Sequence, residues 1–244
     1  MNPWTRATVA AAAAALLAAA GYFGFRWLAV AVFLLSFVLA IGWPVLSWTP
    51  HWIAGSAITL GTGALAVVGV LLGREEPFLR HMVVALAAGT IAALVVEVVK
   101  PSPSGQVVTA VAGTVSGATV AAAGAAWIAT ARTPGAEDLV IAGAVALAIS
   151  AIASVLTTKM WINVVAAVVL SVGAGMSAGT VFPSIEWYGG ALVGFLAACS
   201  FIALHELTRR EVANTSIWAG IASGVAPVTV GGALVYIGGR ILVG

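Results

Sequence analysis

Apolar stretches of 17 to 24 residues follow one another along nearly the whole chain, each closed by a proline, a basic residue or a short polar turn. A helix needs roughly 20 apolar residues to cross the ~30 Å hydrocarbon layer of a membrane, whereas core helices of soluble proteins are shorter and carry polar faces. The pattern predicts an all-α polytopic membrane bundle of eight or nine transmembrane helices in a single domain, residues 1–244. The expected spans are Ala7–Phe23, Trp27–Leu46, Ile53–Leu72, Met82–Val99, Val107–Thr130, Leu139–Thr158, Met160–Phe182, Trp187–His205 and Ser216–Gly239.

The first stretch also has the features of a secretory signal. Arg6 precedes the Ala-rich run Thr8–Ala20, which ends at the small residue Gly21. A basic start, a short apolar core and a small-residue end are typical of a cleaved signal peptide. Because the next apolar stretch begins almost at once at Trp27, a first spanning helix in a tight hairpin explains the same residues. Residues 1–23 are therefore expected to form the first span, with a signal-like segment as the alternative.

Tryptophans support these boundaries independently of hydropathy. Amphipathic indole rings favour the headgroup layer of a membrane. Trp127 and Trp218 lie within a turn or two of an expected helix end, and the other tryptophans lie at or near one. Those at or near an end are Trp4, Trp27, Trp43, Trp48, Trp52, Trp161 and Trp187.

Composition and charge agree with a membrane protein. Hydrophobic residues make up 62% of the chain and charged residues 7%, against roughly 25% charged residues in an ordinary soluble domain. The net charge is +2 and the basic residues form no patch, so nothing indicates nucleic-acid binding. The single cysteine, Cys199, lies in an apolar stretch, which excludes an internal disulfide and a cysteine-based metal site.

Basic residues do not decide the orientation, because equal numbers fall on the two sides of the expected topology. The densest basic loop, Leu207–Glu211, favours the N-terminus inside the cell. The Ala/Val-rich composition fits a bacterial inner membrane. The side with the N-terminus carries Arg6, Lys100, Lys159, Arg209 and Arg210, and the opposite side carries Arg26, Arg74, Arg80, Arg132 and Arg240.

Glycine pairs four residues apart predict close contacts between helices. Such a pair leaves a groove through which two helix backbones approach, and the gained van der Waals contact matters where lipid offers no hydrophobic driving force. The sequence thus predicts a tightly packed bundle. The pairs are Gly69 and Gly73, Gly113 and Gly117, Gly175 and Gly179, Gly190 and Gly194, and Gly220 and Gly224.

Two expected spans contain residues that interrupt helices. The seventh carries the glycine-rich segment Gly173–Gly179 and ends at Pro183, and the ninth carries Pro227 among glycines. Proline removes a backbone donor, and transporters hold solutes at helices that unwind at mid-depth in the membrane. The hydroxyls near these interruptions are candidates to hold a polar solute, although glycine and proline are also simply common in membrane helices. The candidates are Ser177, Thr180, Ser223 and Thr229.

Glu97 is the most informative ionisable residue, since a charge within the hydrocarbon layer costs a few kcal/mol. It lies about one turn before the end of the fourth span, and Lys100 follows three residues later. The two side chains are expected either to form a salt bridge at the membrane interface or to leave Glu97 as a protonatable group coupled to transport. His51, His81 and His205 lie at three separate boundaries, where an interfacial cap is the simpler interpretation.

No complete catalytic, metal or nucleotide motif stands in the sequence. Asp138 is the only aspartate, so the carboxylates that magnesium-dependent phosphoryl chemistry needs are missing. The segment Pro101–Gly105 is sufficiently explained as a turn, and no phosphate-binding glycine loop occurs. We therefore expect no metal site and no cofactor, and no residue indicates an enzyme.

The C-terminal part resembles the closing helices of the membrane domain of the threonine/serine exporter family. The resemblance covers Gly190–Gly194, Leu207–Arg210 and Ala226–Gly238, with an arginine pair and a Pro-Gly turn in similar places. It implies an export function. The soluble N-terminal region of that family has no counterpart in this sequence.

Three function classes are compatible with these features, and a lipid-modifying enzyme ranks last because a credible acid/base or metal constellation is missing. The first is a small secondary transporter or permease that moves a polar solute, with the seventh and ninth spans as its site and Glu97 as a coupling group. The alternative is a non-catalytic membrane subunit or scaffold of a cell-envelope or respiratory complex. The expected partners are membrane lipids, a polar small molecule, and another membrane protein or further copies of this chain.

Overall fold

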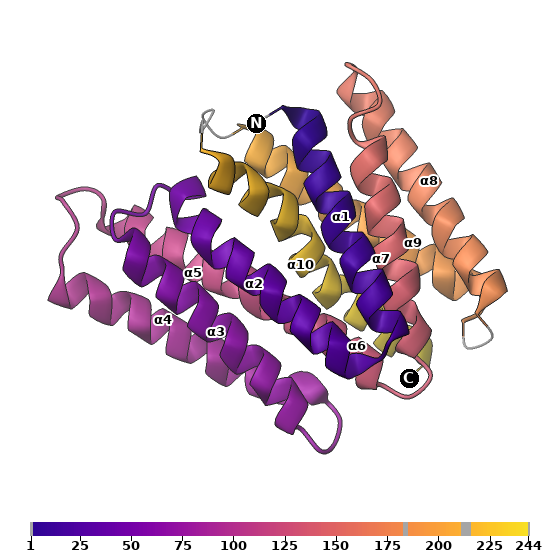
Figure 1. Ribbon diagram of the computed structural model, residues 1–244, viewed down its shortest axis with the longest axis horizontal. Helices are drawn as coiled ribbons and strands as arrows, with labels where there is room; N and C mark the ends of the chain where they lie inside the picture. Colours follow the sequence, from indigo (N-terminus) through magenta and orange to yellow (C-terminus); the bar gives the residue numbers. More distant parts are fainter. Residues whose placement is uncertain (1, 183–184, 211–215, 244) are drawn as a thin grey trace.

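The computed structural model describes residues 2–182, 185–210 and 216–243, and nearly all of them are helical (Figure 1). The prediction of an all-α membrane bundle is confirmed. The α-helices are α1 (Pro3–Tyr22), α2 (Phe25–Leu46), α3 (Trp52–Leu72), α4 (Met82–Val99), α5 (Val107–Ala123), α6 (Ala125–Arg132), α7 (Glu137–Ala153), α8 (Met160–Val181), α9 (Trp187–Arg210) and α10 (Ile217–Val243), and a 3-10 helix, η1 (Phe78–His81), leads into α4.

Eight helical segments are long and apolar enough to span a membrane, with η1 and α4 forming one of them and α5 and α6 another. The remaining helix, α7, has 17 residues, or ~25 Å at 1.5 Å per residue. It is largely buried and runs alongside α1 (Figure 1). The N- and C-termini lie at opposite ends of the bundle, which agrees with nine alternating passes (Figure 1).

The helices form two groups with α10 between them (Figure 1). Helices α2, α3, α4 and α5 pack together on one side, and α1, α7, α8 and α9 on the other. Of the most apolar residues of α10, 72% are buried inside the bundle. The corresponding share is 22% for α8 and 17% for the segment formed by η1 and α4. The central position of α10 therefore joins the groups, and α4 and α8 present broad apolar faces to the surroundings.

The two helices α8 and α9 confirm the prediction from the glycine pairs. Gly175 and Gly190 face each other so closely that a Cβ on either would overlap the carbonyl oxygen of the other. Likewise, a Cβ on Gly194 would overlap the carbonyl oxygen of Ser171, and one on Gly179 would crowd the backbone of Trp187. Only glycine permits this backbone contact along the crossing of the two helices.

Two tryptophans are inserted into glycine notches of neighbouring helices instead of facing the headgroups. The Nε1–H of Trp43 donates to the carbonyl of Gly113 at 2.9 Å, and its ring fills the space beside Gly117. In the same way, Nε1–H of Trp127 donates to the carbonyl of Val228 at 2.9 Å beside Gly232. In both notches the accepting carbonyl lies four residues before the glycine, so one turn of a helix supplies both the hydrogen bond and the space.

The helix interruption lies in a different span from those expected. Helices α8 and α10 are continuous through their glycines, α10 even through Pro227, and Pro183 lies outside the described residues. The break occurs at Gly124, between α5 and α6, where the backbone N–H bonds to the carbonyl of Ala121, three residues back. The glycines of α10 serve as packing notches for side chains of neighbouring helices.

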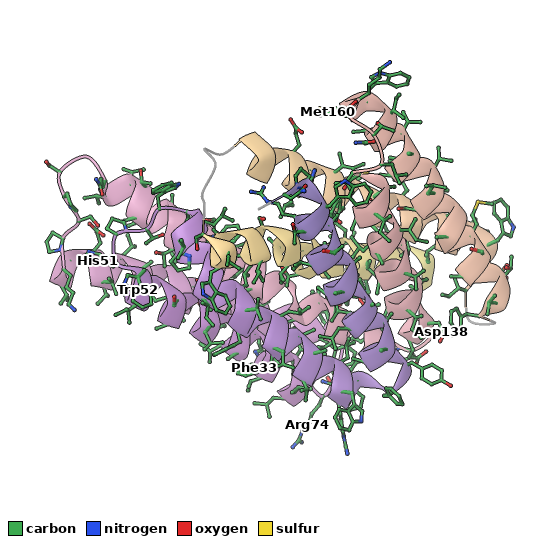
Figure 2. All side chains as sticks on the ribbon, turned by 45° about the horizontal axis from the view of Figure 1, so that its top comes forward. Phe33, His51, Trp52, Arg74, Asp138 and Met160 are labelled. Atoms are coloured by element: carbon green, nitrogen blue, oxygen red, sulfur yellow. The ribbon has the colours of Figure 1, made fainter. Side chains whose placement is uncertain are left out.

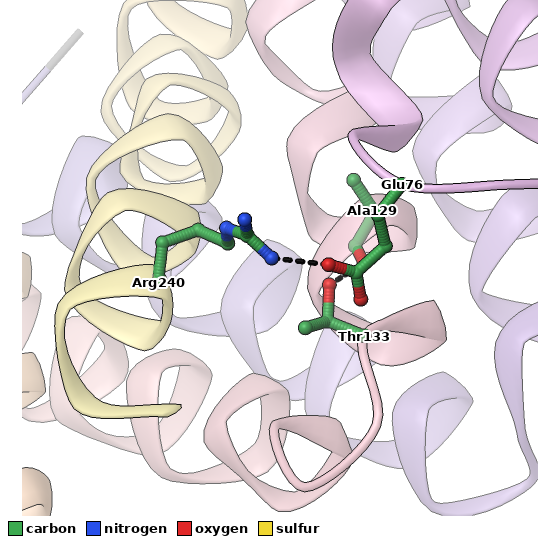
Figure 3. A network of polar contacts seen from close by, with 4 residues as sticks. All are labelled: Glu76, Ala129, Thr133 and Arg240. Atoms are coloured by element: carbon green, nitrogen blue, oxygen red, sulfur yellow. Dashed lines mark hydrogen bonds and ion pairs between the residues drawn. The ribbon is translucent and has the colours of Figure 1, made fainter. Parts of the chain in front are cut away.

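Polar contacts at the end of the bundle that carries the C-terminus tie α6 and α10 to the end of α3 and the segment that follows it. Arg132, the last residue of α6, donates to the carbonyls of Val70 and Gly73 and so caps the C-terminus of α3. Its guanidinium also lies 4.4 Å from the ring centre of Phe78. Figure 3 shows Arg240 of α10 paired with Glu76, which follows α3. Arg74, just beyond α3, and His51, just before it, mark the opposite ends of that helix in Figure 2.

Candidate functional site

A cavity lined by both apolar and polar side chains lies at the end of the bundle that carries the N-terminus. It is formed by the start of α1, the α7–α8 connection, the first turns of α8 and the last turns of α9, and its volume is ≈500 Å³. This size lies in the range of small-molecule sites, which are apolar pockets with a few placed polar groups. Figure 2 labels one lining residue, Met160, at the start of α8. The lining residues are Asn2, Pro3, Trp4, Ser154, Val155, Leu156, Thr157, Thr158, Met160, Asn163, Val164, Ile202, His205 and Glu206.

Asn163 of α8 builds one wall of this end pocket. Its Oδ1 accepts the backbone N–H of Thr157 at 2.9 Å and the Thr157 hydroxyl at 2.7 Å. Its Nδ2 donates to the carbonyls of Ser154 and Thr157 at 2.9 and 2.8 Å. These bonds satisfy the backbone of the connection, so α7 ends at Ala153 and the predicted helix to Thr158 is wrong by five residues, 154–158.

His205 and Glu206 are the titratable groups that line the end pocket. The imidazole of His205 stacks on Phe201 with ring centres 5.7 Å apart and planes inclined by 16°. This contact fixes the imidazole plane at the pocket wall. The Asn2 amide and the Thr158 hydroxyl lie in the same lining.

A buried hydroxyl that does not line the end pocket lies nearby in α7. Ser150 lies one turn before Ser154 on α7, is fully buried, and its Oγ has no hydrogen-bond partner within the described residues. An unsatisfied buried hydroxyl costs about 1–3 kcal/mol. Further along α8 and α9, the glycine contacts bring the two backbones together and leave no space between them. The end pocket therefore opens at one end of the bundle only.

The four hydroxyls predicted to hold a solute are not brought together. Ser177 and Thr180 lie on the exposed face of α8, and each donates to carbonyls of its own helix. Ser223 and Thr229 are buried in α10 and also donate to their own helix. None of them lines the end pocket, although Thr229 packs beside Gly124 at the break between α5 and α6.

Glu97 organises the turn after α4. Its Oε1 accepts the backbone N–H of Ser102 at 2.6 Å and its Oε2 accepts the Ser102 hydroxyl at 2.9 Å, whereas no ion pair joins it to Lys100 within the described residues. Glu97 also lines a cavity of ≈10 Å³, the size of one water molecule, together with His51 and Thr114. The Nε2 of His51 is buried without a hydrogen-bond partner within the described residues.

Sequence reasoning missed the residues that shape the end pocket. Asn163 was hidden in an apolar stretch and Asn2 in the segment before the first span. The one available signal was the cluster of hydroxyl residues around Thr157, which the hydropathy pattern assigned to a helix. Within the described residues, no group of three His, Cys, Asp or Glu side chains could hold a metal ion.

Comparisons with protein-family models, with curated proteins and with solved structures give no match. The similarity of residues 190–238 to the threonine/serine exporter family therefore remains a resemblance in sequence.

Proposed function

We propose that the protein is a small permease-like protein of a bacterial inner membrane that takes up a polar solute in the end pocket. The observation that carries the proposal is the ≈500 Å³ cavity at one end of the bundle, whose apolar lining includes Asn2, Thr157, Asn163, His205 and Glu206. Ionisable residues near the hydrocarbon layer mark solute or ion pathways. His205 and Glu206 meet this description.

The packing below the end pocket supports a state that is open to one side. Gly175 of α8 and Gly190 of α9 bring the two backbones into contact on the way to the opposite boundary. In alternating access, a barrier closes the site on one side of the membrane. During transport that barrier opens and a second barrier closes the site on the other side. Ser150, buried and one turn deeper than Ser154, is the next polar group for a solute to meet.

Proteoliposomes loaded with a panel of radiolabelled amino acids, polyamines and sugars test the proposal under an imposed pH gradient. Val164→Phe fills the end pocket, and we expect it to reduce the flux of any transported solute by roughly tenfold or more, because a methylene misfit alone is worth 10–200-fold. The matched control is Val165→Phe, because Val165 is the next residue of α8 and is 53% exposed outside the pocket.

Glu97→Gln tests the coupling role in the same vesicles. If Glu97 couples transport to protons, the variant loses the dependence of flux on the pH gradient. If it only holds Ser102, the variant keeps that dependence. Absence of flux for every solute, or equal loss in the two valine variants, would contradict the permease proposal.

The exposed face of α8 favours a second candidate function, a scaffold subunit in a larger membrane complex. Gly173, Ser177 and Thr180 place small and hydroxyl-bearing side chains on an outer helix, and such residues are enriched where membrane helices associate. A scaffold should co-purify with a protein partner after extraction in mild detergent. Ser177→Phe should release that partner, whereas Val98→Phe, at an exposed position of α4, should not.

A further inference from the structure

A second cavity of ≈730 Å³ has the opposite chemistry to the end pocket. This lateral crevice lies between the two helix groups, on the side of the bundle that carries the N-terminus. Helices α2 and α5 bound it on one side and the end of α9 on the other, with one residue of α10 between them. Its lining residues are Trp43, Leu46, Ser47, Val108, Thr109, Ala112, Gly113, Ser116, Val120, Leu204, Leu207 and Val230.

The polar side chains of the lateral crevice are already used within the protein. Trp43 donates to the carbonyl of Gly113, and Ser116 donates to the same carbonyl at 2.9 Å. Ser47 donates to the carbonyl of Trp43 at 2.9 Å. Thr109 lies on the exposed surface, in the first turn of α5. The walls therefore present hydrocarbon, and a polar solute would lose its hydrogen bonds to water without replacement.

The dimensions of the lateral crevice match one leaflet of a membrane. It follows α5 from Val108 to Val120, which corresponds to ~18 Å at 1.5 Å per residue. Half of the hydrocarbon layer is ~15 Å thick. At its outer end, Val108 is 80% exposed and Leu207 is 66% exposed, so the crevice is open to the surroundings.

Two arginines stand near the end of α9 in the sequence, between Glu206 and Glu211. Helix α9 ends with Arg209 and Arg210, two and three residues after Leu207, which lines the lateral crevice. Basic residues near a membrane surface attract anionic headgroups, each by a factor of roughly five. We propose that an anionic phospholipid occupies the lateral crevice, with one acyl chain between the two helix groups and its headgroup near the end of α9.

Native mass spectrometry tests the proposal. The full chain is reconstituted in vesicles of phosphatidylglycerol and phosphatidylcholine and is then extracted into mild detergent for the measurement. We expect wild-type protein to retain one phosphatidylglycerol. Ser116→Phe places a ring in the crevice and should lower retention by roughly fourfold for each methylene it displaces. Thr119→Phe is the matched control, since Thr119 is exposed on the same helix and does not line the crevice, and it should retain the lipid.

Two further measurements keep the proposal falsifiable if Ser116→Phe fails to fold. Ala112→Leu fills the same space with a smaller side chain and should also release the lipid. Phosphatidylglycerol with brominated chains should quench wild-type fluorescence more than that of Trp43→Phe, because Trp43 lines the crevice. Release of all lipid by the wild type, or equal retention by the variants at positions 112, 116 and 119, would overturn the proposal.

The headgroup has a test of its own. Arg209→Gln with Arg210→Gln should reduce the preference for phosphatidylglycerol over phosphatidylcholine by roughly fivefold per arginine. Equal retention of both lipids by the wild type would overturn the assignment of an anionic headgroup.

Discussion

At the scale of single residues, the inserted tryptophans combine a hydrogen bond with close packing. Trp127 is fully buried, donates to Val228 and fills the notch beside Gly232. An indole at a membrane boundary would be expected to face the headgroups. Hydropathy gives no information on which tryptophan turns inward, because the partner glycine lies about a hundred residues away in the chain.

Trp127→Ala should destabilise the protein by about 3–5 kcal/mol, since it leaves a large cavity in the core and removes the hydrogen bond to the carbonyl of Val228. Trp127→Phe keeps most of the volume and should cost about 1 kcal/mol through the lost hydrogen bond. Trp161, 68% exposed at the start of α8, is the matched control, and Trp161→Ala should stay within about 0.5 kcal/mol. Unfolding in mixed detergent micelles measures all three, and equal losses at both tryptophans would contradict the notch interpretation.

The sequence identifies Glu97 as an unusual ionisable residue, but it does not predict that Glu97 accepts hydrogen bonds from Ser102. Its position near the end of the fourth span identified it as unusual, but a spacing of three residues to Lys100 is only one of several options for a long carboxylate. The turn at Pro101 brings Ser102 back to the end of α4, where backbone and hydroxyl both donate to Glu97. That geometry depends on a turn conformation that spacing along a helix does not describe.

At the scale of helices, the sequence predicts the spans well and the interruptions poorly. Eight of the nine expected spans occur as helical segments long and apolar enough to cross a membrane, and the sixth is the shorter helix α7. The interruption at Gly124 could not be predicted from the sequence. A glycine in an Ala-rich stretch has the same neighbours in the sequence whether it interrupts a helix or packs against another one. Conversely, Pro227 removes one donor, and the notches filled by Trp127 and Leu147 hold the helix around it.

The crossing of α8 and α9 provides a sharp test of glycine packing. Gly190→Ala would place a methyl group against the carbonyl of Gly175 and should destabilise the protein by roughly 1–3 kcal/mol, because the backbones have to separate. Gly173→Ala is the matched control on α8, since a Cβ there meets nothing within 4 Å. It should be neutral or stabilise the helix by up to about 1 kcal/mol.

The readout is again unfolding in mixed micelles, with circular dichroism to follow helix content. Destabilisation of similar size by Gly173→Ala would show that glycine flexibility, and not the close approach, governs these helices. A neutral Gly190→Ala would show that the two backbones do not approach as closely as described.

At the scale of the whole molecule, the end pocket and the lateral crevice arise only from tertiary structure. The end pocket joins Asn2, Asn163 and His205, which belong to three different helices or their ends. No periodicity within one span predicts such a meeting, because each residue on its own fits an interfacial position. The hydroxyls chosen from the sequence were selected for being near glycine and proline, and that choice ignored which helix face each one occupies.

The placement of the two chain ends on opposite sides of the bundle has a consequence for any tagged form of the protein. A green fluorescent protein joined to one end will lie in the cytoplasm and mature, whereas the same reporter joined to the other end will be exported unfolded and stay dark. With the N-terminus inside, as the loop Leu207–Glu211 favours, cells glow only with the tag before Met1, and alkaline phosphatase is active only when fused after Gly244. Equal fluorescence from both fusions would mean an even number of crossings, with α7 lying within one leaflet.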